Sequence, residues 1–514
     1  MTALADAAAR ERITDDLAST LFVDAGAGSG KTKSLVQRVR QIVLVDGVPL
    51  RHVAAVTFTE KAAAELRDRL RAEFEAAITR DASDEARQRA AHALDDLDSA
   101  AIGTLHSFAR RVLMAHPIEA GLPPLVEVAD EVASQVAFEQ RWQLLLQELL
   151  VDPAVADALS LALDMGVKPE HLRSLARDFD ADWDLLEPRV LIGSDPSVPR
   201  IDLASFVLRA GIVADRRREC TNPDDKFLGR LSALTAWAAQ HSGSPSQGEA
   251  VVALEGLCSL SRAYGQSKNW PDLTGVKAEF QAIQDDAAQV LAEVRHAVLV
   301  ILARRLARAC LEGAELRRRE GRLDFHDLLV LARDLLRSPE HGAEVRAALH
   351  DRYQRLLLDE FQDTDPIQIE LAVRIAGGRD ADAARWQDVV VPEGRLFVVG
   401  DPKQSIYRFR RADIAVYLQA RGAVGRTEKL TTNFRTVKPL LDWVNHVFGR
   451  LITEEPEKQP EFIALDHPPQ RRDHAGAAAA LAIHRLGVAQ VGATPGGLGL
   501  VHRGVGVLEQ VGGH

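Results

Sequence analysis

Short apolar runs alternate with longer amphipathic stretches in the first part of the chain. The runs 21–25 (LFVDA), 52–58 (HVAAVTF) and 99–108 (SAAIGTLHSF) predict buried strands, the last of them ending in a loop. Apolar residues at helical spacing follow the first two runs, over 31–45 and 60–78. Strands that alternate with helices predict the α/β class, with a parallel doubly wound sheet that binds ligands at the carboxyl ends of its strands.

The pattern changes further along the chain. Apolar residues recur at helical spacing over 125–320, with no convincing strand, which predicts an all-helical insert. Strand-like runs return at 355–361 (RLLLDEF) and 395–401 (RLFVVGD), and we expect them to complete the first sheet. The insert therefore separates two halves of one predicted lobe, residues 1–124 and 321–425.

Composition narrows the class of protein. The chain of 514 residues is too long for one core, and 46% hydrophobic with 27% charged residues is typical of a soluble globular protein. No apolar run is long enough to cross a bilayer and no secretory leader is recognisable, while three scattered cysteines fit a reducing cytoplasm. The net charge of −11 does not exclude DNA as a partner, because DNA binding needs only a local basic face.

Residues 474–514 form a different kind of sequence, with ten glycines and a single acid, Glu509. We expect this segment to be loosely ordered. A shifted reading frame or a truncated gene is a hypothesis that explains it, and translation of the other two frames beyond codon 470 tests it.

The segment AGAGSGKT fits the phosphate-binding P-loop pattern, with Ala25 where the stricter pattern has glycine. Small residues let successive backbone N–H groups wrap phosphates at the start of a helix. We expect Lys31 to reach the β- and γ-phosphates and Thr32 to bind Mg²⁺ through its hydroxyl. The alternative is a chance match, at roughly a few per cent for such a chain. The predicted cradle consists of Ala25, Gly26, Ala27, Gly28, Ser29, Gly30, Lys31 and Thr32.

The segment LLLDEFQDTD supplies the second half of a predicted ATPase site. Asp359 follows a buried strand and is expected to hold the metal through water. Its neighbour Glu360 is expected to orient and deprotonate the attacking water. A helix start or a salt bridge is the alternative for an Asp-Glu pair after apolar residues, and the preceding P-loop favours the catalytic interpretation.

The segment LFVVGDPKQSIYRFRRADI follows the last predicted strand. Gln404 is placed to sense the γ-phosphate. Tyr407, Phe409 and Arg410 then form a group of two aromatic rings and a cation, which is how proteins stack single-stranded bases without reading their sequence. The alternative is that both rings pack into the core.

These motifs, with HSFARRVLMAHPIEAGLPP and LDFHDLL, resemble in order and spacing the superfamily 1 DNA helicases of the UvrD/Rep type, and most of all the RecB/AddA branch. The resemblance runs from about residue 10 to 470. It implies a RecA-like P-loop NTPase lobe, the start of a second such lobe at 426–473, and ATP with Mg²⁺ between the lobes. It also implies single-stranded and duplex DNA as substrate, 3′ to 5′ movement, a role in DNA repair or recombination, no membrane partner, and a RecC/AddB-like partner subunit.

The resemblance assigns further roles at positions that match family motifs. Phe58 and Thr59 would lie under the DNA strand, and Thr104 and His106 would contact DNA or its backbone, although a lone histidine at a strand end is more often structural. In LTTNFRT, two further residues would act on the nucleotide. Phe434 would stack on adenine and Arg435 would reach the γ-phosphate from the second lobe.

The chain departs from the family pattern in three places. A position near Arg10 stands where the family usually has an adenine-reading glutamine, and Arg411 stands where it typically has glycine. The later motifs (KGLEF-like and VALTRA-like) and a nuclease domain are not recognisable. A truncated protein that binds ATP and DNA without turnover is therefore the rival hypothesis. A P-loop kinase or transporter ATPase is disfavoured, because neither explains GDPKQSIYRFR.

Overall fold

The computed structural model describes residues 3–80, 83–363, 365–406, 411–456, 458–469 and 471. The predicted tail at 474–514 lies outside these residues. The chain divides into two compact units, Met1–Phe108 with Leu335–His514, and Ala109–Asp334. None of the helices in the described ranges is both long enough and apolar enough to cross a lipid bilayer.

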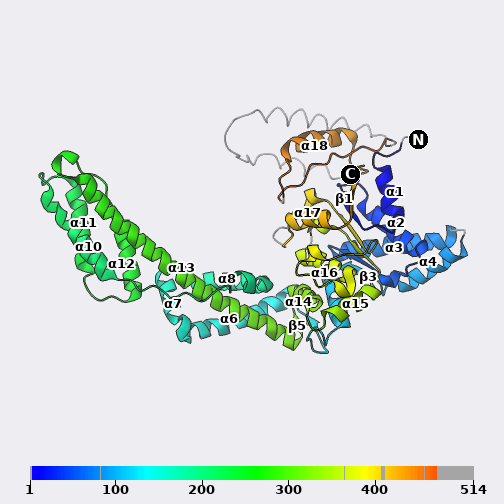
Figure 1. Ribbon diagram of the computed structural model, residues 1–514, viewed down its shortest axis with the longest axis horizontal. Coiled ribbons are helices and arrows are strands. Elements are labelled where there is room, and N and C mark those ends of the chain that lie inside the picture. Colours follow the sequence, from blue (N-terminus) through cyan, green and yellow to red (C-terminus); the bar gives the residue numbers. More distant parts are fainter. Residues whose placement is uncertain are drawn as a thin grey trace, which may run out of the picture. The chain divides into compact units, whose positions relative to one another are not determined.

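A six-stranded parallel sheet forms the centre of the first unit, in the order β3-β2-β6-β7-β1-β8 (Figure 1). All of its strands except β8 were expected from short apolar runs, and most are buried along their whole length. The predicted α/β class with a parallel sheet is confirmed. The strands are β1 Leu21–Ala25, β2 Val53–Thr57, β3 Ala101–Thr104, β6 Arg355–Leu358, β7 Leu396–Gly400 and β8 Arg426–Leu430.

Helices cover both faces of this sheet. Leu35 and Val39 of α2, with Leu70 of α3, join one buried cluster with alternate residues of the strands. On the other face Phe22 of β1 meets the ring of Tyr417 from α17, with the ring centroids 5.1 Å apart. The helices are α1 Ala7–Asp15, α2 Lys31–Leu44, α3 Glu60–Arg80, α4 Asp84–Asp96, α15 Gly342–Arg352, α16 Pro366–Gly377, α17 Ile414–Ala423 and α18 Lys438–Leu451.

Two parts of the first unit differ from expectation. The third strand does not end in a loop, because α5 (Leu105–Ala115) begins directly after Thr104, whose hydroxyl accepts a hydrogen bond from the Ser107 backbone N–H. Residues 426–430 were expected to open a second lobe, yet they form β8, which pairs in parallel with β1. Only alternate residues of this edge strand, Glu428 and Leu430, are buried, so it shows no apolar run.

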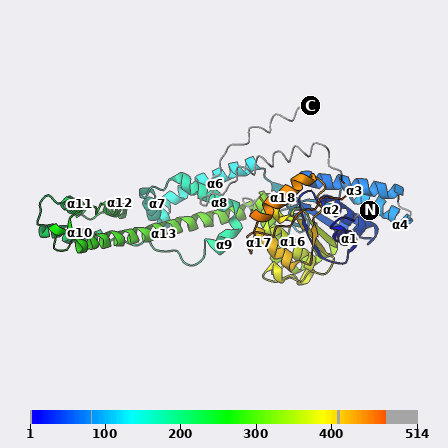
Figure 2. The ribbon, with the colours of Figure 1, turned by 90° about the horizontal axis from the view of Figure 1, so that it is seen from above.

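The second unit is almost entirely helical, as the apolar spacing predicted. Helices α7, α8, α10 and α12 contact the 48-residue helix α13, and α10–α12 lie along its N-terminal part (Figures 1 and 2). The helices are α6 Glu131–Val151, α7 Pro153–Asp164, α8 Pro169–Ala181, α9 Leu186–Arg189, α10 Leu203–Asp215, α11 Lys226–Gln240, α12 Gln247–Ser259, α13 Leu273–Glu320 and α14 Phe325–Arg337. One correction is a two-residue strand inside the insert, β4 Glu127–Val128, which pairs with β5 Arg322–Leu323.

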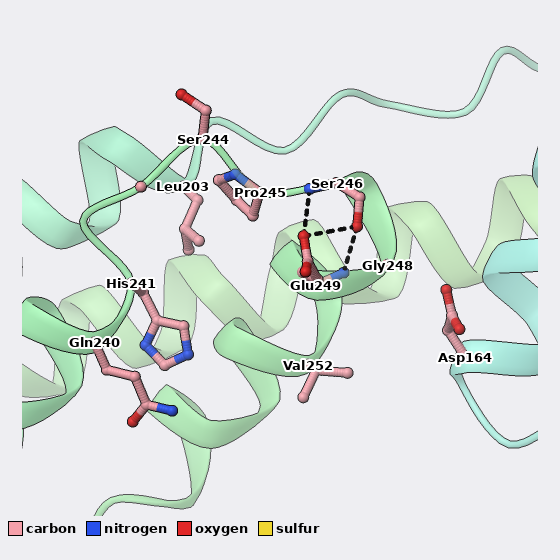
Figure 3. A pocket seen from close by; sticks show the side chains of 11 residues that line it. Asp164, Leu203, Gln240, His241, Ser244, Pro245, Ser246, Gly248, Glu249 and Val252 are labelled. Atoms are coloured by element: carbon pink, nitrogen blue, oxygen red, sulfur yellow. Dashed lines mark hydrogen bonds between the residues drawn. The ribbon is translucent and has the colours of Figure 1, made fainter.

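A hollow of about 620 Å³ lies beside the start of α12 in this unit (Figure 3). Two of the residues that line it, Ser246 and Glu249, form hydrogen bonds at the N-terminus of α12. The Ser246 N–H donates to Glu249 Oε2 at 2.7 Å, and Ser246 Oγ accepts from the Glu249 N–H at 3.3 Å. These reciprocal bonds satisfy orphan groups at the helix start, so the pair has a structural role.

A buried polar pair between β1 and α17 gives a prediction for stability. Tyr417 donates its hydroxyl to Asp24 Oδ1 at 2.7 Å, both side chains are buried, and Arg421 Nη1 lies 3.3 Å from the other carboxylate oxygen. Replacing Tyr417 by Phe removes one donor from a buried carboxylate. We expect the free energy of unfolding in urea to fall by about 1–3 kcal/mol. Tyr264→Phe, at an exposed ring, is the control and should change it by less than about 0.5 kcal/mol.

Candidate nucleotide-binding site

The predicted site residues that the structure describes follow the carboxyl ends of the strands of one sheet. Parallel strands present these ends at the same edge, where ligands of such sheets bind. Tyr407, Phe409 and Arg410 lie outside the described residues. The others are Thr104 at the end of β3 with His106 after it, Phe58 and Thr59 after β2, Asp359 and Glu360 after β6, Gln404 after β7, Ala25 at the end of β1 with 26–32 after it, and Phe434 and Arg435 after β8.

The loop between β1 and α2 has the backbone of a phosphate cradle. Gly28 and Gly30 have φ angles of 71° and 87°, in the left-handed region that favours glycine. Within the described residues, the start of α2 has no side-chain cap, and the buried hydroxyl of Ser29 has no hydrogen-bond partner. Unpaired N–H groups at a helix start, beside an unpaired buried hydroxyl, fit an anion such as the phosphates of ATP.

The P-loop lysine is paired with an acid in this structure. Lys31 Nζ lies 2.6 Å from Glu360 Oε2, at the carboxyl end of β6. Glu360 itself has a φ of 49°, a left-handed conformation that is rare outside glycine. The sequence placed both residues at one site, and the structure brings them together.

Asp359 is a buried acid of the site. Its N–H donates to Val56 O of β2 at 2.8 Å, and its Oδ1 accepts from the Glu360 N–H at 2.9 Å. Burial, and then the neighbouring charge of Glu360, raises the pKa of Asp359 from 3.8 to about 6. A nearby cation would therefore stabilise its ionised form.

The residues present fit a magnesium ion held together with a nucleotide. Among the described residues no group of three or more acid, histidine or cysteine side chains is able to hold a metal alone. Mg²⁺ uses one or two protein oxygens and completes its shell with phosphate and water. The Thr32 hydroxyl and the Asp359 carboxylate are the protein ligands we expect, and the ion would neutralise charge on the phosphates.

Gln362 connects this acid pair to the next strand and was not predicted. Its Nε2 donates to Glu360 Oε2 at 2.8 Å, and its Oε1 accepts from the Asp401 N–H at 2.8 Å. Asp401 Oδ2 in turn accepts from Gln404 Nε2 at 2.7 Å. An unbroken row of polar contacts thus runs from Lys31 to Gln404. A glutamine between acids does not stand out in a sequence as a functional residue. Its amide can nevertheless both donate and accept hydrogen bonds.

The loop after β8 lies directly on the P-loop. Asn433 Nδ2 donates to Ala27 O at 2.7 Å and the Phe434 N–H donates to Gly28 O at 2.9 Å. A Cβ on Gly28 would lie 2.9 Å from the Cβ of Arg435. The expectation that Arg435 approaches from a second lobe is corrected, because it follows β8 of the same sheet. The buried Asn433, which fastens this loop, was not predicted.

An N-terminal network also holds this loop, and only the position of Arg10 was noted from sequence. The Asp6 carboxylate accepts from the backbone N–H groups of Thr431 and Thr432 and from the Thr432 hydroxyl. It also pairs with Arg10, whose Nη2 donates to Ser29 O at 2.9 Å. Burial would raise the pKa of Asp6, but hydrogen bonds from Arg10 and Thr432 outweigh it and lower that pKa. Partners more than 400 residues apart leave no local sequence pattern.

The predicted DNA-contacting residues on β2 and β3 lie at neighbouring strand ends, since Thr57 pairs with Thr104. Thr59 is exposed and its hydroxyl caps α3 by accepting from the Ala62 N–H. Thr104 is buried and donates its hydroxyl to Glu60 at 2.8 Å. Phe58 and His106 are partly buried. DNA contact by Phe58, Thr59, Thr104 and His106 stays a prediction.

Arg411, which replaces the glycine of the family pattern, has a φ of 65°. This is the left-handed conformation that glycine adopts without steric cost. The structure therefore keeps a glycine-like backbone at Arg411 and places its Nε 3.5 Å from the Asp365 carboxylate.

The raised pKa of Asp359 predicts how stability changes with pH. The folded state keeps a proton that the unfolded state has already lost, so the free energy of unfolding falls as pH rises from about 4 to about 6. Asp359→Asn removes the free-energy cost of ionising this buried carboxyl. We expect the variant to exceed the wild type by an amount on the order of 3 kcal/mol at pH 8, and the difference to vanish near pH 4. Urea unfolding with EDTA and without nucleotide measures it, and a constant difference would contradict the assignment.

Comparisons with known proteins agree with this geometry. The family model described as UvrD/REP helicase N-terminal domain matches residues 6–424. The RecBCD enzyme subunit RecB of Escherichia coli (strain K12) is 29% identical over 486 residues, covering 84% of this chain and 38% of that protein. The A subunit of the ATP-dependent helicase/nuclease of Syntrophomonas wolfei is 26% identical over 496 residues, covering 85% and 37%.

A relative with the same name from Exiguobacterium sibiricum is 27% identical over 495 residues, covering 87% of this chain and 40% of that protein. The chain thus spans about two-fifths of the length of these curated relatives. The match extends over most of this chain and includes the P-loop, the Asp359–Glu360 pair and the loop after β7. This chain belongs to the UvrD/Rep helicase family.

Proposed function

We propose that this chain binds ATP with Mg²⁺ and uses ATP hydrolysis to move along single-stranded DNA and separate duplex strands. The family resemblance supports 3′ to 5′ movement, a cytoplasmic role in DNA repair or recombination, and a RecC/AddB-like partner subunit. One relative is named as part of the RecBCD enzyme and others as part of a helicase/nuclease. The start of a second lobe remains part of this proposal, after β8, which pairs with β1 in the sheet of the first lobe.

Each described side chain has a separate task in the proposed reaction. Lys31 exchanges Glu360 for the β- and γ-phosphates when the nucleotide arrives. Glu360, released from the lysine, accepts a proton from the attacking water. Arg435, whose Cβ lies against the P-loop, supplies positive charge toward the γ-phosphate, and the exposed ring of Phe434 offers a surface for the base.

The row of contacts from Lys31 to Gln404 is the observation that carries the proposal. It joins the phosphate-binding lysine to the residue that stands three positions before Tyr407 in sequence. When Glu360 moves away from Lys31, its hydrogen bond with Gln362 is expected to change. Gln362 is bonded to Asp401 and Asp401 to Gln404, so the change would pass along this row to Gln404. Two nucleotide states with different arrangements of this row would hold DNA differently, which is what a ratchet requires.

Single-turnover ATP hydrolysis, with and without a single-stranded oligonucleotide, tests the proposal. A motor predicts faster hydrolysis when DNA is present. Hydrolysis that DNA does not change, or ATP binding with no hydrolysis, would favour the rival function of an ATP- and DNA-binding module.

The double variant Tyr407→Ala with Phe409→Ala tests the proposed DNA contact. Loss of two stacking rings, each worth about 1–3 kcal/mol per base, is expected to weaken oligonucleotide binding at least tenfold. The affinity for ATP should stay within about twofold of the wild type. Fluorescence anisotropy of a labelled oligonucleotide measures the first quantity and calorimetry the second. A fall in ATP affinity instead would show that the rings belong to the core.

A further inference from the structure

Three successive carbonyl groups of the P-loop accept hydrogen bonds from donors outside the loop. They are Ala27 O from Asn433 Nδ2 at 2.7 Å, Gly28 O from the Phe434 N–H at 2.9 Å and Ser29 O from Arg10 Nη2 at 2.9 Å. In a trans peptide the carbonyl and the N–H of the next residue point in opposite directions. The N–H groups of Gly28 and Gly30 therefore face away from these donors, toward the side where the phosphates are expected.

Asn433 provides one of these bonds and also holds the turn that follows it. Its Oδ1 accepts from the Arg435 N–H at 2.9 Å and from the Thr436 N–H at 2.7 Å. The side chain is buried, and its amide group bonds to the P-loop at one end and to the backbone of Arg435 at the other. An amide suits this place because it donates and accepts hydrogen bonds at the same time.

These bonds bring the start of the Arg435 side chain against the P-loop. A Cβ built on Gly28 would lie 2.9 Å from Arg435 Cβ and 3.0 Å from Asn433 Nδ2, which leaves no room for a side chain at Gly28. The Asn433 backbone N–H also donates to Asp466 O at 2.8 Å, so a second segment fixes Asn433. Arg435 thus begins at a set distance from the phosphate cradle.

We infer that Asn433 is a positioning residue for Arg435, which it holds in register with the P-loop so that the site distinguishes ATP from ADP. The inference rests on the proposed function, in which Arg435 supplies positive charge toward the γ-phosphate. ADP lacks that phosphate, so the ratio of the ADP to the ATP dissociation constant reports on Arg435. A residue that only supports the fold would change both dissociation constants alike.

Calorimetric titration of the whole chain with ADP and with the non-hydrolysable analogue β,γ-imido-ATP, each with Mg²⁺, tests the inference. Asn433→Asp keeps the size of the side chain and an acceptor for the Arg435 N–H, but it cannot donate to Ala27 O. We expect the ratio of the ADP to the analogue dissociation constant to fall about tenfold, because Arg435 loses a charge-assisted bond to the γ-phosphate. Asn433→Ser removes the amide without adding charge, so it gives the same fall and serves if the first variant does not fold.

Arg435→Ala provides the reference for this ratio. It should lower the ratio by about tenfold or more, because it removes the charge itself. Adding Asn433→Asp to Arg435→Ala should then change the ratio by less than about twofold, since two residues that act through one contact are not additive.

Asn445→Asp is the matched control. Asn445 also donates through Nδ2 and accepts through Oδ1, at 2.8 and 3.0 Å, but both bonds go to the backbone of Leu465. Its replacement should leave the ratio within about twofold of the wild type, because Arg435 is not its partner.

Three results would overturn the inference while the proposed function stands. Asn433→Asp leaves the ratio unchanged, lowers it as much in the Arg435→Ala background as in the wild type, or is matched in its effect by Asn445→Asp. Two other results would overturn the proposed function as well. They are a wild type that binds neither nucleotide and an Arg435→Ala variant with the wild-type ratio.

Discussion

Lys31→Ala is expected to weaken ATP binding by about 100-fold or more. The lysine belongs to the cradle, its side chain is only 10% exposed, and a charge-assisted hydrogen bond to phosphate contributes about 1.5–3 kcal/mol. Removing it also leaves Glu360 without its partner beside the phosphates, so like charges would face each other. Equilibrium binding of a fluorescent ATP analogue with Mg²⁺ measures the loss.

Lys33→Ala provides the control for this variant, because Lys33 lies two residues further along the same helix and is exposed. It removes the same charge from the chain and should leave the dissociation constant within about twofold. Circular dichroism of both variants checks that the fold is kept. Equal ATP affinity in wild type and Lys31→Ala would refute the P-loop assignment.

Glu360→Gln is expected to lower the rate of ATP cleavage by about 10²–10⁴-fold while nucleotide binding is kept. The amide cannot accept the proton of the attacking water. The structure adds a second expectation, because Glu360 holds Lys31 at 2.6 Å before any nucleotide is bound. Without the carboxylate charge the lysine is free, so ADP should bind as tightly as in the wild type or more tightly. Rapid-quench assays measure cleavage, and calorimetry measures ADP binding.

Glu340→Gln serves as the control, since Glu340 is an exposed acid outside both motifs. It should change neither the cleavage rate nor ADP binding. Normal cleavage by Glu360→Gln would remove this residue from the role of base. A loss of ADP affinity would show that the Lys31–Glu360 pair supports the cradle rather than competing with the phosphates.

The strands of the sheet were predictable because central parallel strands are buried on both faces and therefore appear as short apolar runs. The P-loop was predictable because its backbone geometry requires small residues in a fixed order. By contrast, β8 has the sequence RTEKL, in which only alternate residues are buried, and it resembles a surface segment. The start of α5 was missed because Leu105 follows Thr104 directly, with no loop residues between the strand and the helix.

Side chains that join distant parts of the chain escaped prediction for a different reason. Asp6 and Asn433 act through backbone groups of other segments, and such partners are known only after the chain has folded. Gln362 stands between acids with obvious chemistry, yet it connects Glu360 to the backbone after β7. The candidate catalytic residues could be found from their chemical types, whereas the residues that position them required coordinates.

The placement of β1 has a consequence for how the protein is made. This strand carries the P-loop, yet its two neighbours are β7 and β8, so Leu21 pairs with Phe397 and Arg426. A ribosome must add several hundred residues before either neighbour emerges, and until then an apolar strand has open edges on both sides. Pairings this distant in sequence form slowly and expose nascent chains to aggregation. We therefore expect chaperones that shield apolar strands to raise the yield of this chain during synthesis.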